Sequence, residues 1–441
     1  MKLLASAVGL ASVVSTSLAS PTESISSRDT RISYDGHHVY RINTNTQKDI
    51  EGVKAKFAHL PTLQSHNSFE VVVPPNEVHA VEDLGLNIRL LSDDLGAQIR
   101  AEAVQPTYKR ELSKKGELPN LSWFESYHAY EDHLTYWDDL QAAFPNNSEK
   151  INLGQSYEGR DLYAFHLWGD EGNSEEKPII YWHGTVHARE WITTMVVEYL
   201  TYQLIDGYTS GDANVTSFLN YYDFWIVPFH NPDGFKYTQT TNRLWRKSRQ
   251  PRSNTTCIGT DLNRNWDYTW YLDPEGGGSV STNPCSETFK GLGPGDTPEN
   301  IVLSALSKKL AATGQGIRSY IDWHSYSQLI LTPWGWSCAP EDLPATLPRM
   351  REVGEGVANA IRAVDGKEFI VGPACEVLYS STGTGRDYHH GVLAANHSWS
   401  LELRPTSSGE GGFILPPEQI WPSVREQWAG QLWMLDEIKN D

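Results

Sequence analysis

A histidine and a glutamate stand three residues apart in His187-Ala-Arg-Glu190, just after the apolar run 179–182. A second apolar run, 320–323, leads into His324. Two histidines and one carboxylate leave a tetrahedral zinc ion with one open position, which a water can fill in a catalytic site. An H-x-x-E pair is common by chance, and a single histidine after a strand is more often a packed core residue. The three residues are therefore a candidate metal site that the surrounding sequence must support.

The elements around these residues predict the sheet that positions them. Six short apolar runs have the pattern of buried strands: 162–167, 179–182, 224–228, 320–323, 329–332 and 399–403. Four longer stretches have a helical period: 191–205, 299–312, 347–364 and 416–438. Buried strands that alternate with helices predict an α/β fold with a mixed, mainly parallel sheet of about eight strands between helices. In such folds ligands bind beyond the carboxyl ends of strands, where His187 and His324 stand.

The first hundred residues have a different pattern. Short β-rich runs alternate with helical ones in the order 39–42, 47–58, 69–73, 76–84 and 88–91. This order predicts a small α+β open sandwich without cysteines.

A polar stretch, 101–119, follows this unit and carries the dibasic pairs Lys109-Arg110 and Lys114-Lys115. It has no apolar periodicity, so we expect an exposed linker, where proteolytic cleavage concentrates.

The start of the chain predicts a secretory signal peptide. Lys2 precedes an apolar stretch, and small residues follow at Ser17 to Ala19. A membrane anchor is the alternative, but the stretch is short and interrupted by serine, and no other segment is apolar enough to span a bilayer. We therefore expect a secreted, extracellular protein divided into residues 1–20, 21–112 and 113–441.

Charge and cysteine content narrow the class of protein further. The chain has 36 basic and 55 acidic side chains, a formal net charge of −19, so no nucleic-acid partner is expected. Four cysteines are an even number for an oxidising compartment and favour two disulfides over free thiols. Zinc ligation by cysteine is the weaker alternative, because no C-x-x-C pair exists. Five sequons fit a secreted glycoprotein and begin at Asn120, Asn146, Asn214, Asn254 and Asn396.

Seven ordered motifs surround the candidate metal residues. They are His187-Ala-Arg-Glu-Trp191, Asn231-Pro-Asp-Gly-Phe235, Asn242-Arg-Leu-Trp-Arg-Lys247, Asp261-Leu-Asn-Arg-Asn-Trp266, Pro284-Cys-Ser-Glu-Thr288, His324-Ser-Tyr-Ser-Gln328 and Glu402-Leu-Arg404. In order and spacing, residues 120–441 resemble the funnel-type zinc metallocarboxypeptidases of the pancreatic A/B group. Residues 34–100 resemble the inhibitory pro-domain of that family.

The resemblance implies a carboxypeptidase fold and a zymogen, with the pro-domain and its activation linker at 21–112 and the catalytic domain at 113–441. It implies a hydrolase with one Zn²⁺ per chain that removes single residues from peptide and protein C-termini. Its partners would be those substrates and an activating protease, and we expect a monomer. A catalytically inactive binding relative, or an enzyme that hydrolyses a different amide, is the alternative.

The resemblance also assigns roles to residues. It implies that His187, Glu190 and His324 bind zinc, and that Asp261 supports His187. It makes Glu402 the catalytic base, although a strand-end ion pair with Arg404 is an alternative. The remaining implied roles are oxyanion binding by Arg246, binding of the terminal carboxylate by Asn263, Arg264 and Tyr379, a subsite at Arg189, and the disulfides Cys257–Cys285 and Cys338–Cys375.

Arg386 predicts which C-terminal residue is preferred. In the resembling family this position lies at the base of the pocket for the last side chain. An arginine there predicts a preference for acidic residues, because a guanidinium pairs with a carboxylate. The alternative is that Arg386 turns away toward Asp387 or Glu376 and leaves an apolar pocket.

Overall fold

The computed structural model describes residues 31–441 apart from 66, 103–116, 171, 173–175 and 274–278. The predicted leader and both dibasic pairs of the predicted linker lie outside the described residues. No helix within the described part of the chain is long and apolar enough to cross a membrane.

The N-terminal segment, residues 31–102, contains an antiparallel sheet in the order β2-β3-β1-β4. Its elements are β1 (His38–Asn43), α1 (Gln47–Lys56), β2 (Thr62–Gln64), β3 (Ser68–Val73), η1 (Pro75–Glu77), α2 (Val78–Glu82), β4 (Asn87–Ser92) and α3 (Leu95–Ala101). Thr46 starts α1 because its side chain accepts the N–H of Asp49 in a capping box. Ile42, Val53 and Val71 form the centre of a small core of its own.

The rest of the chain forms an eight-stranded sheet in the order β11-β10-β12-β9-β7-β8-β6-β5. Its strands are β5 (Ser148–Gln155), β6 (Asp161–Leu167), β7 (Ile179–His183), β8 (Asp223–Val227), β9 (Ile317–Ser325), β10 (Leu329–Thr332), β11 (Ile370–Pro373) and β12 (His397–Leu403). The four central strands β12, β9, β7 and β8 are mutually parallel, and β10 and β6 run antiparallel to their inner neighbours. The predicted mixed sheet is therefore confirmed.

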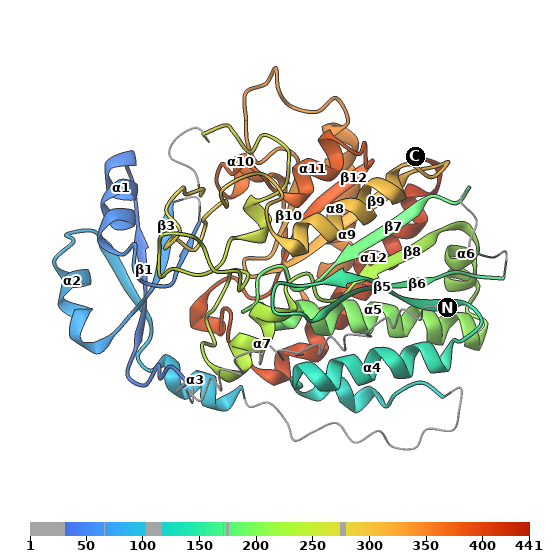
Figure 1. The fold of residues 1–441 in the computed structure, drawn as a ribbon, viewed down its shortest axis with the longest axis horizontal. Helices are drawn as coiled ribbons and strands as arrows, with labels where there is room; N and C mark the ends of the chain where they lie inside the picture. The colour runs from blue at the N-terminus through green and yellow to red at the C-terminus, as the bar shows by residue number, and fades with distance from the viewer. Residues whose placement is uncertain (1–30, 66, 103–116, 171, 173–175, 274–278) are drawn as a thin grey trace, which may run out of the picture. The chain divides into compact units, whose positions relative to one another are not determined.

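Helices cover both faces of this sheet, with α4 and α5 below it and α8 and α11 above it in Figure 1. The helices are α4 (Tyr130–Ala143), α5 (Trp191–Ser210), α6 (Ala213–Tyr221), α7 (Pro232–Thr240), α8 (Pro298–Ala311), α9 (Leu347–Asp365), α10 (Ala374–Val377), α11 (Gly385–Gly391) and α12 (Ile420–Glu437). Short 3-10 turns are η2 (Leu121–Glu125), η3 (Leu262–Arg264), η5 (Ser408–Glu410), η6 (Pro417–Gln419) and η7 (Ile438–Asn440).

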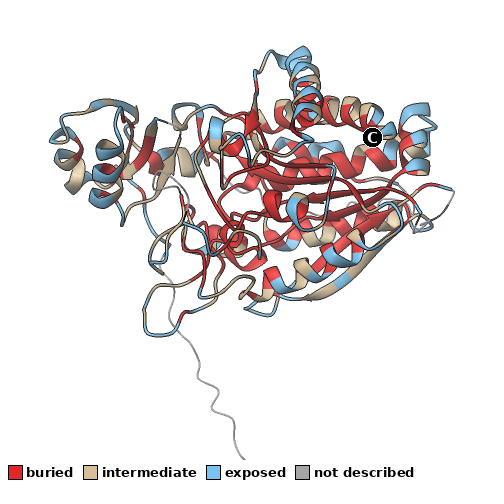
Figure 2. Ribbon diagram, turned by 90° about the horizontal axis from the view of Figure 1, so that it is seen from above, coloured by how far each residue is buried: buried red, intermediate tan, exposed pale blue. Residues whose placement is uncertain are grey.

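Side chains alternate between the two faces along each strand. Trp182 on β7 and Trp323 on β9 pack into the core under α4, α5, α9 and α12. Tyr181 and Tyr320, which are an odd number of positions from these tryptophans, pack into the core under α8 and α11. The strands are buried on both faces, as Figure 2 shows, so their apolar runs are continuous.

Two disulfides join loops of this larger unit. Cys257 is bonded to Cys285 and Cys338 to Cys375, with Cα–Cα distances of 5.0 and 5.7 Å. These are the two pairs that the resemblance implies. The second links the segment after β10 to α10.

Candidate active site

Three neighbouring parallel strands bring the candidate metal residues together at their carboxyl ends. The loop after β7 carries His187, and Glu190 is the residue immediately before α5. His324 lies near the end of β9, and Glu402 on β12 is its direct partner in the strand register. Because β7, β9 and β12 are parallel, these side chains meet at one edge of the sheet.

The two histidines and Glu190 present their donor atoms to one point. The Nδ1 atoms of His187 and His324 are 3.1 Å apart. The Glu190 carboxylate lies 2.8 Å from the first through Oε1 and 3.3 Å from the second through Oε2. One ligand atom from each residue lies within 4.8 Å of the others. Two imidazole nitrogens and one carboxylate close to one point are a donor set that fits a zinc ion.

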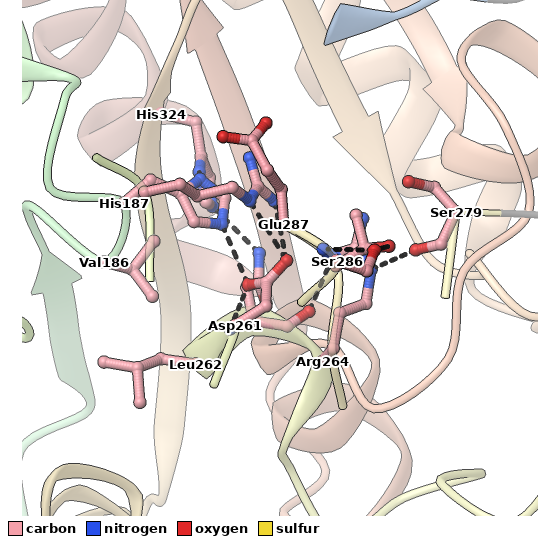
Figure 3. A network of polar contacts seen from close by, with 12 residues as sticks. Val186, His187, Asp261, Leu262, Arg264, Ser279, Ser286, Glu287 and His324 are labelled. Carbon is pink, nitrogen blue, oxygen red and sulfur yellow. Dashed lines mark hydrogen bonds and ion pairs between the residues drawn. The ribbon is translucent and has the colours of Figure 1, made fainter. Parts of the chain in front are cut away.

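The outer nitrogen of each imidazole faces a further carboxylate. His187 Nε2 lies 3.2 Å from Asp261 Oδ1, which Figure 3 shows below the two rings. His324 Nε2 lies 3.0 Å from Asp322 Oδ2. Carboxylates in these positions fix the ring orientation and the tautomer of metal-binding histidines.

Asp261 is buried and also forms an ion pair with Arg246. Its Oδ2 atom accepts hydrogen bonds from Nε and Nη2 of Arg246, at 3.1 and 2.9 Å. Burial opposes ionisation of Asp261, but Arg246, Arg264 and His187 outweigh it and hold the pKa of Asp261 well below its usual value. Asp261 therefore stays ionised and links Arg246, the residue expected to bind the oxyanion, to the metal group.

Glu402 lies in a poorly solvated position beside the metal group. Burial raises its pKa to about 7, and the charges of Glu190 and Asp322 act in the same direction, against His324 and Arg246. The proposed alternative, an ion pair with Arg404, is wrong, because Arg404 instead binds Glu426, Asp365 and Gln419. A carboxyl group with a pKa near neutrality can both accept and donate a proton.

The residues expected to bind a terminal carboxylate lie in the same cavity as the metal group. Asn263 accepts the N–H of Gly385 at 2.8 Å. Arg264 is buried and donates to the carbonyls of Ser279, at 2.6 Å, and Asn263, at 2.8 Å; the bond to Ser279 is visible in Figure 3. Its guanidinium carbon lies 5.9 Å from the centre of the Tyr379 ring.

Arg386 lines this cavity from α11 and is 3% exposed. Nε donates to Asp387 at 3.0 Å and Nη1 to the Ser400 hydroxyl at 3.3 Å, whereas Nη2 is buried with no hydrogen-bond partner among the described residues. Of the two expected alternative partners, Asp387 is bound and Glu376 instead pairs with Arg351. Arg386 thus pairs with Asp387 and still faces the cavity. The other lining side chains at this end include Leu331, Ala374, Leu378 and Ser381.

Arg189 lies outside the metal cavity and lines a neighbouring cavity of about 300 Å³. It is buried, pairs with Glu287 at 3.0 Å, and places its guanidinium 4.0 Å from the centre of the Phe413 ring. Residues of the N-terminal segment line this same cavity, and Leu63 lines both cavities. The N-terminal segment therefore contributes to the lining of both cavities.

Asp322 is a site residue that the sequence reasoning missed. It stands two positions before His324 on β9, so strand alternation places both side chains on one face. The signal in the sequence was this spacing, Asp-x-His, within a buried strand. This spacing assigns a role to Asp322 only if His324 is already known to bind a metal.

Comparison with known proteins agrees with this geometry. Residues 133–430 match the model of the family described as zinc carboxypeptidase. The chain is 41% identical to metallocarboxypeptidase A of Trichophyton rubrum, over 99% of both chains, and 31% identical to carboxypeptidase A2 of Rattus norvegicus, over 91% and 92%. The crystal structure of carboxypeptidase A from Helicoverpa armigera superposes with a TM-score of 0.79, at 26% identity, over 93% of this chain and 98% of that one. The chain therefore belongs to the zinc carboxypeptidase family and is a metallocarboxypeptidase.

Proposed function

We propose that the chain removes C-terminal residues from peptides with one zinc ion held by His187, Glu190 and His324. The observation that carries this proposal is the convergence of these three donors and Glu402 on one cavity. A zinc ion bound there supplies Lewis-acid polarisation of the scissile carbonyl and lowers the pKa of a water.

Glu402 is the proton carrier in this proposal. Its carboxylate takes a proton from the attacking water and passes it to the leaving amine nitrogen. The raised pKa supports this role, because the group releases the proton readily near neutral pH. Arg246 stabilises the developing oxyanion. Nε and Nη2 of Arg246 donate to Asp261, so Nη1 is the nitrogen that donates to the oxyanion.

The free carboxylate of the substrate is held by Asn263, Arg264 and Tyr379. Arg264 is always charged, and a guanidinium can bind two carboxylate oxygens at once. Their position in the same cavity as Glu402 supports this assignment. Arg189 would contact substrate residues farther from the cleaved bond, because it lines the neighbouring cavity.

Arg386 gives the enzyme a preference for C-terminal Glu or Asp. Its unpaired Nη2 is a buried donor that a substrate carboxylate satisfies, whereas an aromatic or aliphatic side chain leaves it unsatisfied. Asp387 already neutralises part of the charge of Arg386, which favours the alternative of an apolar preference. We favour the acidic preference because of the unpaired nitrogen.

We also propose that the enzyme is made as a secreted precursor. Residues 1–20 are the leader, and an activating protease cuts between Lys109 and Lys115. The inhibitory role of the N-terminal segment is supported by Leu63, which lines the metal cavity, and by Glu102, whose carboxylate binds Arg243 through two hydrogen bonds of 2.6 Å. All five sequon asparagines are exposed, which is compatible with glycosylation: Asn120, Asn146, Asn214, Asn254 and Asn396.

One experiment tests the central proposal. The full chain is assayed on a peptide ending in Glu before and after cleavage in the linker, with zinc measured by atomic absorption. We expect little release of the last residue before cleavage, efficient release afterwards, and loss of activity without loss of far-UV circular dichroism when a chelator removes the zinc. Full activity of a zinc-free sample would refute the metal assignment. A cleaved, zinc-loaded sample without activity on any peptide would instead favour the inactive binding relative.

A further inference from the structure

The N-terminal segment places one carboxylate in a polar niche beside the metal cavity. Glu70 lies on β3, and its side chain is 6% exposed. Its Oε2 atom accepts hydrogen bonds from the Tyr326 hydroxyl at 2.6 Å and from the Ser408 backbone N–H at 3.0 Å. The Ser408 hydroxyl donates to the same oxygen. Three donors therefore converge on one carboxylate oxygen.

The other oxygen of Glu70 is held within the N-terminal segment itself. Arg41 Nε lies 3.0 Å from Oε1, and Nη2 of Arg41 also donates to it. When the N-terminal segment is removed, Glu70 and Arg41 leave together. The donors on Tyr326 and Ser408 stay, because both residues follow the linker. The donors that bind the Glu70 carboxylate then remain in the enzyme without it.

The niche adjoins the metal cavity. Tyr326 lines the metal cavity and also the small neighbouring cavity that contains Glu70 and Ser408. Arg189 and Phe413 line this neighbouring cavity too, whereas Arg386 lines only the metal cavity. The niche is therefore next to the metal cavity through Tyr326, and it is lined by residues other than Arg386.

We propose that this niche is a second recognition site for substrate, specific for an acidic side chain upstream of the released residue. In the precursor, Glu70 occupies the position that this side chain takes. The inference rests on the proposed carboxypeptidase activity and on removal of the N-terminal segment.

The donors of the niche distinguish a carboxylate from a neutral amide. The Ser408 N–H can only donate, and hydrogen bonds from neutral donors to a carboxylate are stronger than those to an amide oxygen. A glutamine can place its oxygen in the niche but gains only neutral hydrogen bonds. We expect a preference for Glu over Gln of about five- to tenfold in kcat/KM at one upstream position.

The test uses the full chain, cleaved in the linker and separated from its N-terminal segment. The substrates share one C-terminal residue and carry Glu, Gln or Ala at each of the four preceding positions in turn. Ser408→Asp puts a negative charge into the niche, and Ser407→Ala is the matched control on the same turn. We expect one position at which Glu is favoured, loss or reversal of that preference in Ser408→Asp, and no change in Ser407→Ala.

Two results would overturn the inference while leaving the proposed function intact. One is equal kcat/KM for Glu and Gln at all four positions. The other is a Glu preference that Ser408→Asp leaves unchanged, which would place the recognition elsewhere. Absence of any hydrolysis by the cleaved parent would instead overturn the proposed function. A second measurement uses the intact precursor, in which Glu70→Gln should weaken the contact and raise the residual activity.

Discussion

The two ends of the active-site cavity differ in how their buried side-chain nitrogens are paired. At the metal end, both nitrogens of His187 and His324 face carboxylates, on Glu190 at the inner side and on Asp261 and Asp322 at the outer side. At the pocket end, Arg386 keeps a buried nitrogen without a hydrogen-bond partner among the described residues. A buried donor left unpaired costs about 1–3 kcal/mol. At the metal end each imidazole nitrogen thus has a carboxylate of the protein beside it, whereas one nitrogen of Arg386 has no such partner among the described residues.

A second buried arginine sharpens this contrast. Arg404 lies two residues after Glu402 and is 2% exposed, close to the 3% of Arg386. Its guanidinium binds Glu426, Asp365 and Gln419. Arg404 is thus a structural ion-pair residue, and each of its three side-chain nitrogens has a hydrogen-bond partner.

The largest effect is expected at the metal end, from Glu402→Gln. The variant removes the proton acceptor but no metal donor, so kcat should fall by about a hundred- to ten-thousandfold while zinc content stays the same. Single-turnover kinetics and metal analysis on the cleaved enzyme measure both quantities. Near-normal turnover would mean that Glu402 is structural, and loss of zinc would mean that it helps to hold the metal.

Arg386→Ile should produce the next largest effect, at the pocket end. Removal of one partner of a buried charge pair should lower kcat/KM for a peptide ending in Glu by about thirty- to several-thousandfold. The value for a peptide ending in Phe should rise, because the buried nitrogen without a hydrogen-bond partner is gone. Arg351→Ile is the matched control, since Arg351 pairs with Glu376 and does not line the cavity. If the parent cleaves Phe faster than Glu, or the ranking survives the substitution, the acidic preference is wrong.

The buried elements of the fold could be predicted from the sequence, and the edges could not. β6, β7, β9 and β12 are buried along nearly their whole length, so their apolar runs are visible. β5 is an edge strand with a polar sequence of mostly half-buried and exposed residues, and β11 is four residues long and ends in Gly-Pro. Both obtain their hydrogen bonds and register from a neighbouring strand, which no local pattern reveals.

Some features of the site could likewise be predicted from the sequence, and others could not. The roles proposed for His187, Glu190, His324 and Glu402 came from motifs, because each residue sits in a short local pattern. The pairing of Glu70 with Tyr326 joins residues 256 positions apart, and the unpaired nitrogen of Arg386 is the outcome of packing by several elements. Such features depend on tertiary contacts and were beyond reach of the sequence.

Asp322→Asn tests whether the metal end depends on its outer carboxylates. The variant keeps the size of the side chain but removes the charge that holds His324, so zinc affinity should fall about ten- to a hundredfold. Competition with a chelator of known affinity measures it without relying on turnover. Asp365→Asn is the control, because Asp365 is a half-exposed partner of Arg404 away from the metal. An unchanged zinc dissociation constant would show that Asp322 does not position His324.

The smallest effect is in the pH dependence, and it separates the two ends within one experiment. Glu402 must be ionised to accept a proton, so kcat/KM should be full above its pKa and fall below it, by about tenfold per pH unit. Burial places that pKa at about 7 in the protein alone, and a bound divalent cation should lower it, because positive charge favours the carboxylate. This acid limb should therefore be the same for peptides ending in Glu and in Phe.

A peptide ending in Glu should show a second loss of activity near the ordinary pKa of its own side chain, about 4.3, because a protonated carboxyl no longer pairs with Arg386. The second loss should vanish in Arg386→Ile. If the two peptides instead give superimposable profiles in the parent down to the pH of unfolding, Arg386 does not bind the charged side chain.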